Sequence, residues 1–199
     1  LVLSRQDLPV LDRSEGTGLA GAENVAKGGY VLKEASAEPK VVLVGTGSEL
    51  QLAVAAAEKL EADGVPARVV SLPCVEWFAA QDDAYRAEVL PAGVPKVVVE
   101  AGVTVGWKDL LGANTDAVGI DHYGASAAAG VLYKEFGITA DAVYAAAHDL
   151  YGITFTRRAD LVGHTPEAEV YEVHNADGSP VGLFVIHVFV RRSLPRNPE

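Results

Sequence analysis

The sequence predicts an α/β fold with a three-layer, mostly parallel sheet, followed by a C-terminal β-hairpin. Short apolar runs recur along residues 40–121, segments with helical spacing separate them, and the pattern changes after Gly152. Wholly apolar runs are typical of strands buried on both faces, and their alternation with helices favours parallel pairing. We therefore expect a linker and loop over residues 1–39, an α/β domain over 40–148, and a separate segment over 149–199.

The first strand and helix of the domain are the clearest. Residues 41–44 (VVLV) form the strand, a GTGS turn follows over 45–48, and apolar positions at helical spacing predict a helix over 49–63. Upstream, glycines interrupt residues 8–39 and leave little periodicity. This segment is expected to be a long loop that ends in a short edge strand over 29–32.

The later elements repeat the alternation. We expect further strands at 67–72, 96–100 and 118–121, helical structure around Trp77, Phe78 and Tyr85, and helices over 107–111, 127–135 and 139–150. Thr139 has an oxygen that can cap the free N–H groups of the last helix, and Asp141 suits its first turn.

The C-terminal segment changes to strand periodicity. Two β runs, 170–174 and 181–188, flank Asp177-Gly178, which is a strong signal for a hairpin turn. A lone two-stranded hairpin is marginal in water, so we expect it to pack on something or to pair at its edges. Residues 191–199 follow no pattern and are predicted to be a disordered tail.

Composition excludes several classes of protein. The formal net charge is -11 and no Lys/Arg cluster exceeds a pair, so we expect no nucleic-acid partner. No apolar run approaches the roughly 20 residues that span a bilayer, and the single cysteine suits a reducing cytoplasm. The chain has no methionine and opens inside the apolar run Leu1–Leu3, so we expect it to be truncated there.

The turn Gly45-Thr46-Gly47-Ser48 is a candidate cofactor site. A turn between a strand and a helix can direct backbone N–H groups at a phosphate, which allows NAD(P)H or a phosphorylated small molecule. The dinucleotide pattern G-x-G-x-x-G is incomplete, because Leu50 occupies its last position, and Glu49 places a negative charge at the helix start. The alternative interpretation is a purely structural turn.

Asp121 and His122 are the candidate catalytic pair. They follow the predicted fourth strand, and a histidine that titrates near neutrality beside a carboxylate can act as an acid or a base. The alternative is a loop histidine whose hydrogen bonds are satisfied by backbone and solvent. No arrangement of residues predicts a metal site.

Several strings resemble transketolase. In chain order they are LSRQDLP (3–9), VLVGTGSE (42–49), SLPCVEWFAAQ (71–81), VEAG (99–102) and DHYGASA (121–127). The resemblance covers residues 1 to about 148 and points to the carboxy-terminal domain with the short segment before it. It implies that thiamine diphosphate binds in upstream domains, so this chain alone is not expected to bind it.

The same resemblance implies a role for Arg5 and a partner. Arg5, in the SRQ string, matches a family position that contacts the sugar phosphate of the substrate, and a guanidinium can form two bonds to phosphate. The dimeric transketolases imply that this chain also forms a homo-oligomer.

The remainder, about 150–190, resembles the thimet oligopeptidase and peptidyl-dipeptidase family of zinc peptidases. That family's zinc site needs a His-Glu-x-x-His string, which is absent here. The sequence therefore predicts a chimera.

Two classes of function remain. One is a non-catalytic, interface-forming domain. The other is a small enzyme, such as an NAD(P)H-dependent oxidoreductase, that acts at the crevice near residues 45–48.

Overall fold

The chain forms two compact units in a computed structural model. The units are Leu1–Tyr151 and Gly152–Glu199, and each is described here by itself. The structure describes residues 4, 6–150, 154–158, 160–161, 168–174 and 180–187. Within these residues, no helix combines the length and the apolar character needed to cross a membrane.

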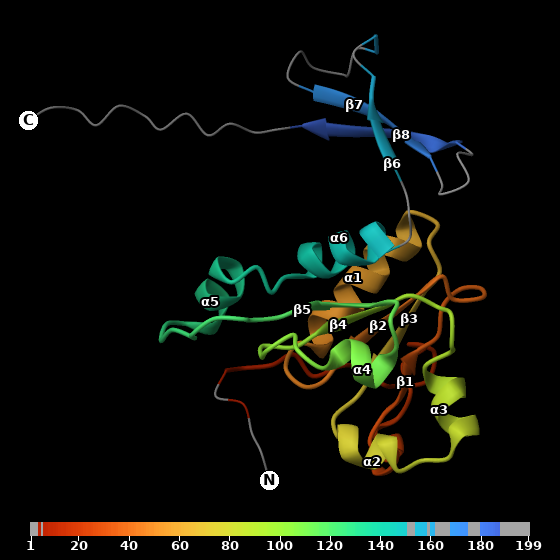
Figure 1. Ribbon diagram of the computed structural model, residues 1–199, viewed down its shortest axis with the longest axis vertical. Helices are drawn as coiled ribbons and strands as arrows, with labels where there is room; N and C mark the ends of the chain where they lie inside the picture. Colours follow the sequence, from red (N-terminus) through yellow and green to blue (C-terminus); the bar gives the residue numbers. More distant parts are fainter. Residues whose placement is uncertain are drawn as a thin grey trace, which may run out of the picture. The chain divides into compact units, whose positions relative to one another are not determined.

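A five-stranded sheet runs through the first unit (Figure 1), in the order β1-β3-β2-β4-β5. Its strands are β1 (Tyr30–Lys33), β2 (Val41–Gly45), β3 (Ala67–Ser71), β4 (Lys96–Val99) and β5 (Thr115–Val118). All neighbours pair in parallel except β1, which runs antiparallel to β3 at the edge. The predicted α/β class and the mostly parallel sheet are confirmed.

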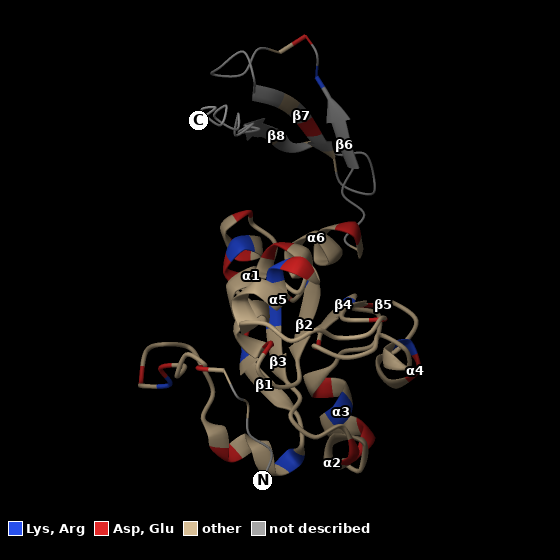
Figure 2. Ribbon diagram, turned by 90° about the vertical axis from the view of Figure 1, so that its left-hand side faces the viewer, with Lys and Arg blue, Asp and Glu red and all other residues tan. Residues whose placement is uncertain are grey.

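Helices cover both faces of this sheet (Figure 1). One face packs against α1 (Leu50–Ala62) and α6 (Ala140–Leu150), around the buried residues Val41, Leu43, Leu60, Val69, Val97, Ile138 and Val143. The other face packs against α2 (Val75–Ala79), α3 (Asp83–Val89) and α4 (Trp107–Leu111), around Val42, Val44, Val70, Leu72, Phe78, Val89 and Val98. Charged residues lie mainly on the helices and loops (Figure 2). Because β2 is buried along its whole length, its apolar run needs no polar alternation.

Local chemistry explains the helix boundaries. Asp82 caps α3 by accepting a hydrogen bond of 2.8 Å from the Tyr85 N–H, which separates α3 from α2. Thr139 Oγ1 accepts from the Ala142 N–H at 3.1 Å, so the predicted cap of α6 is present. The expected loop before β1 contains a short 3-10 helix, η1 (Ala22–Lys27), that the sequence pattern missed. The remaining helix, α5, covers Ala129–Glu135.

The fourth parallel strand lies three residues earlier than expected. The apolar residues of 118–121 favoured a strand there, yet β5 covers Thr115–Val118 and contains an exposed Asp116. An edge strand tolerates polar residues because one side of it has no partner. Residues 119–121 instead leave the sheet and enter a loop that reaches Thr104.

The second unit contains a three-stranded antiparallel sheet in the order β6-β7-β8. Its strands are β6 (Thr154–Arg157), β7 (Ala168–His174) and β8 (Pro180–His187). Strand β6 was not predicted. Arg158 forms ion pairs with Asp160 at 2.6 Å and with Glu172 at 2.7 Å. The predicted Asp-Gly turn and the predicted tail lie outside the described residues.

Candidate functional site

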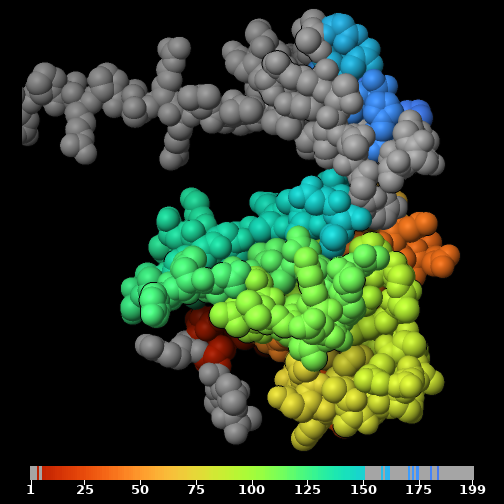
Figure 3. Space-filling view, viewed as in Figure 1, coloured from red at the N-terminus to blue at the C-terminus, as the bar shows by residue number. Residues whose placement is uncertain are grey.

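A cavity of about 530 Å³ opens at the carboxyl ends of the parallel strands. One wall is formed by Ser48 and Glu49 after β2, Ala101 after β4 and Ile120 after β5. Helix α5 and the residues before it form the opposite wall. This is the edge where open α/β sheets bind ligands. The described start of the chain reaches the same place, since Gln6 also lines the cavity. In the space-filling view this segment, coloured red, lies under the green residues near 120–136 (Figure 3).

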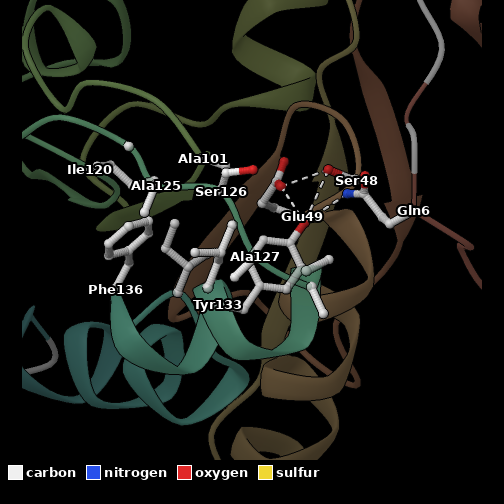
Figure 4. A pocket seen from close by; sticks show the side chains of 15 residues that line it. Gln6, Ser48, Glu49, Ala101, Ile120, Ala125, Ser126, Ala127, Tyr133 and Phe136 are labelled. Carbon is white, nitrogen blue, oxygen red and sulfur yellow. Dashed lines mark hydrogen bonds between the residues drawn. The ribbon is translucent and has the colours of Figure 1, made fainter.

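Hydrogen-bonding groups gather at one end of the cavity (Figure 4). Glu49 is only 3% exposed, and its Oε1 accepts hydrogen bonds of 2.6 Å from both the Ser48 and the Tyr133 hydroxyls. Gln6 Nε2 donates to the Tyr133 oxygen at 3.2 Å. A buried carboxylate needs such donors, because burial without them is costly.

Apolar side chains line the other end (Figure 4). Ile120 and Phe136 face the space, Leu132 also lines it, and the small side chains of residues 127–129 leave room beside them. The cavity therefore joins a buried acid to an apolar compartment, and its volume falls in the range of small-molecule sites, roughly 300–1,000 Å³.

Burial and a neighbouring charge perturb the acids and the phenol of this region. Burial raises the pKa of Glu100, and the nearby Glu49 carboxylate raises it further. Burial also raises the pKa of Tyr133, and its hydrogen bond to Glu49 adds to that effect. Tyr133 therefore stays protonated at neutral pH and acts as a donor to Glu49.

Replacing Glu100 by glutamine should stabilise the protein at neutral pH. The folded state raises the pKa of Glu100, so the protonated side chain favours folding. This contribution of Glu100 to the free energy of unfolding is fully present below the unfolded pKa near 4.5. It is lost as pH rises through the folded pKa, because the buried side chain then carries a charge. We expect Glu100→Gln to raise Tm at pH 7 by a few degrees, about 2–4 °C, and to have a smaller effect at pH 4. The measurement is thermal unfolding at both pH values.

The exposed Glu135, replaced by glutamine, removes the same charge as a control. An equal rise in Tm for both variants, or a larger effect of Glu100→Gln at pH 4, would contradict the assignment.

The two glycines of the turn 45–48 differ in the space that a Cβ would have. A Cβ on Gly45 would lie 2.6 Å from the Leu50 Cα, so Gly45 allows β2 to approach α1 closely. A Cβ on Gly47 would meet nothing within 4 Å. On this side of the turn lies a second cavity of about 290 Å³, lined by Gly47, Ser48 and Arg13 among others. The Arg13 Nε is buried there and donates no hydrogen bond to the described residues.

Asp121 and His122 are adjacent in the loop, but no hydrogen bond between described residues joins their side chains. Asp121 accepts from the Thr104 N–H at 2.8 Å and from the Thr104 hydroxyl at 2.7 Å, and these bonds lower its pKa. The Nδ1 of His122 lies 2.8 Å from the Tyr123 carbonyl oxygen, and its ring packs edge-on against Phe136 at 5.0 Å between centroids. Their role as an acid and base stays a prediction.

Sequence patterns missed the chemistry of Glu49 and Tyr133. The sequence indicates for Glu49 only an effect on the helix start, and Tyr133 lies 84 residues away from it in the chain. The alternation of α5 with the strands placed Tyr133 on a helix but gave no signal for its contact. Arg5, the predicted phosphate ligand, lies outside the described residues.

Known proteins share this architecture. The family described as "Transketolase-like TK C-terminal domain" matches residues 28–139. Transketolase 7 from Craterostigma plantagineum is 51% identical over 155 residues, which are 75% of this chain and 22% of that protein. The structure of transketolase from Leishmania mexicana has a TM-score of 0.61 at 46% identity, over 67% of this chain and 19% of that one.

A split-gene transketolase, described as an inactive beta4 tetramer, is more distant. It has a TM-score of 0.52 at 25% identity, and the match covers 63% of this chain and 42% of that one. The match to transketolase 7 spans about a fifth of the length of that protein. Because the family match covers more than half of its residues, and because the sheet and its helices agree with it, the chain belongs to the family of transketolase-like C-terminal domains.

Proposed function

We propose that the α/β unit is a non-catalytic, interface-forming domain of a transketolase-type homo-oligomer. The observation that carries the proposal is a set of exposed apolar residues on two loops at the carboxyl edge of the sheet. Val103 is 65% exposed, Val105 85% and Tyr123 99%. The two hydrogen bonds from Thr104 to Asp121 join these loops. Apolar residues held in place at the surface are typical of a contact with another protein part.

The relatives support this proposal by their length. Transketolase 7 has more than three quarters of its chain outside the matched region, so a domain of this kind has large neighbours to contact. The split-gene transketolase is described as an inactive beta4 tetramer, which agrees with a non-catalytic, self-associating domain. In this proposal the peptidase-like segment, residues 150–190, adds no zinc chemistry, and Arg5 binds the substrate phosphate only beside the upstream domains.

The test uses the whole chain and a chimera. We expect the whole chain to show no ketol transfer and no binding of thiamine diphosphate by calorimetry. A Leishmania mexicana transketolase that carries residues 1–150 of this chain in place of its own matching segment should be active. In that chimera Val105→Ser should reduce the dimer fraction measured by sedimentation, because it removes apolar contact.

Val131→Ser on α5 is the matched control, since Val131 is also exposed, at 53%. Turnover by the whole chain, free of contaminating enzyme, would refute the non-catalytic role. Equal dimer fractions for the two valine variants would refute the interface.

The second candidate function is binding of NAD(P)H or of a phosphorylated small molecule at residues 45–48. The Arg13 Nε, which donates to none of the described residues, lines the same cavity as Gly47 and Ser48 and favours this function, because a guanidinium and a helix start both attract phosphate. The reaction in this case is an oxidoreduction at the strand-end crevice, with His122 and Asp121 as acid and base.

Gly47→Val distinguishes this site from a structural turn. A Cβ at this position would meet no protein atom within 4 Å, so the fold should survive, but the valine fills space that a phosphate needs. We expect titration with NADPH and with inorganic phosphate to lose its signal in this variant. Gly130→Val, at another open position, should bind as the unchanged chain does. Binding that survives Gly47→Val would exclude the turn as the site.

A further inference from the structure

The cavity of about 530 Å³ that Glu49 lines, the Glu49 cavity, carries only negative charge among its described lining residues. Among its fifteen described lining residues there is no Lys, Arg or His, and the Glu49 carboxylate is its one formally charged group. Both hydroxyl donors bond to Oε1, and Oε2 accepts no hydrogen bond from the described residues. A buried carboxylate whose donors are neutral gains most from a cation, since opposite charges attract strongly where water is excluded.

The second carboxylate strengthens the preference for a positive charge. Glu100 lies close enough for the Glu49 charge to act on it. An anion at this position would be repelled by the Glu49 carboxylate, which lines the cavity, and Glu100 lies close to that carboxylate. Phosphate binding is therefore disfavoured in this cavity, although it stays a candidate on the Arg13 side of the turn.

The shape and lining of the cavity identify the rest of the ligand. A volume of about 530 Å³ exceeds the needs of a bare metal ion, and the described residues contain no group of three His, Cys, Asp or Glu that could hold one. Ile120 and Phe136 offer apolar contact at the end away from Glu49 (Figure 4), and Leu132 also lines the cavity. The ring of Tyr133, whose hydroxyl bonds to Glu49, can add attraction for a cation at its face.

We infer that this cavity binds a small organic amine, with a primary ammonium group at the Glu49 carboxylate and an apolar body against Ile120, Leu132 and Phe136. The ammonium donates to Glu49 Oε2, while Ser48 and Tyr133 hold Oε1. The apolar body displaces water from the second compartment, which contributes free energy roughly in proportion to the buried area. Because the cavity joins an acidic end to an apolar end, its ligand is an amine with an apolar body.

A matched series of probes tests the inference on the full chain. Phenethylamine, 2-phenylethanol and 3-phenylpropionate share a phenyl group and differ in charge. Calorimetry should show saturable binding of the amine, at least about tenfold weaker binding of the alcohol, and no binding of the acid. Chemical shifts in a nitrogen-proton spectrum should move at residues 48–49, 120 and 132–136. Equal affinity for amine and alcohol, or shifts confined to another region, would overturn the proposal.

Variants separate the role of the carboxylate from folding. Glu49→Gln should weaken amine binding at least about tenfold, whereas Glu135→Gln, which removes a charge from an exposed position of α5, should leave it unchanged. Glu49 is buried, so its replacement could disturb folding. Ala127→Leu provides a second test, because it keeps the acid and reduces the volume of the cavity. It should also weaken binding of phenethylamine. Unchanged affinity in a folded Glu49→Gln protein, or binding of Mg²⁺ that competes with the amine, would refute the assigned ligand.

Discussion

Gly28→Ala should destabilise the α/β unit by about 2–5 kcal/mol, from the combined effects of a left-handed residue and overpacking. Gly28 ends η1 with φ of 81°. A Cβ on it would lie 2.4 Å from the Phe78 nitrogen and 2.5 Å from the Cys74 carbonyl oxygen. Both are backbone atoms, so neither can rotate away. The change also disturbs the hydrogen bond of 2.9 Å from the Cys74 N–H to the Gly28 carbonyl.

Gly16→Ala is the control that separates the two effects. Gly16 has φ of 94°, but a Cβ there would meet nothing within 4 Å. It should therefore lose only the conformational part, about 1–2 kcal/mol. Urea unfolding of both variants measures the difference. Equal losses would show that the contact of Gly28 with α2 contributes nothing.

Leu43→Ala should be comparably destabilising, at about 2–5 kcal/mol. Leu43 lies at the centre of β2, has 0% exposure, and packs between the strands and the helices on the α1 side. Truncation leaves a cavity that the parallel strands on both sides prevent from collapsing. Leu110→Ala provides the comparison, since Leu110 on α4 is 54% exposed. It should stay within about 0.5 kcal/mol of the unchanged chain.

Urea unfolding followed by circular dichroism measures both leucine variants. Similar free energies of unfolding for the two would contradict the central position of β2.

The buried strands could be predicted because their apolar runs reflect burial on both faces. The runs 41–44, 67–72 and 96–100 correspond to β2, β3 and β4 within one residue. The edge strand β5 was misplaced because burial no longer controls its composition: Thr115 and Asp116 are polar, whereas the loop after it contains Ile120. Hydrophobic pattern therefore identifies the centre of this sheet better than its margin.

The candidate site could be predicted only in location. The topology of an α/β sheet indicates its strand-end edge, and the turn 45–48 does reach that edge. The partners of Glu49 come from Gln6 and Tyr133, which are brought there by tertiary packing and not by spacing in the chain. Asp121 illustrates the same limit, since its contact is Thr104, 17 residues earlier.

The position of α6 late in the chain affects when the sheet is covered during synthesis on the ribosome. Strands β2, β3 and β4 can pair once residue 99 has emerged, but Ile138, Val143 and Ala147 complete the apolar cluster on one face of the sheet only later. At about 5–20 residues per second, translation from residue 99 to residue 150 takes roughly 3–10 s. During that interval we expect the nascent chain to present the part of this face that α1 leaves open, and to be open to chaperones that recognise apolar surface.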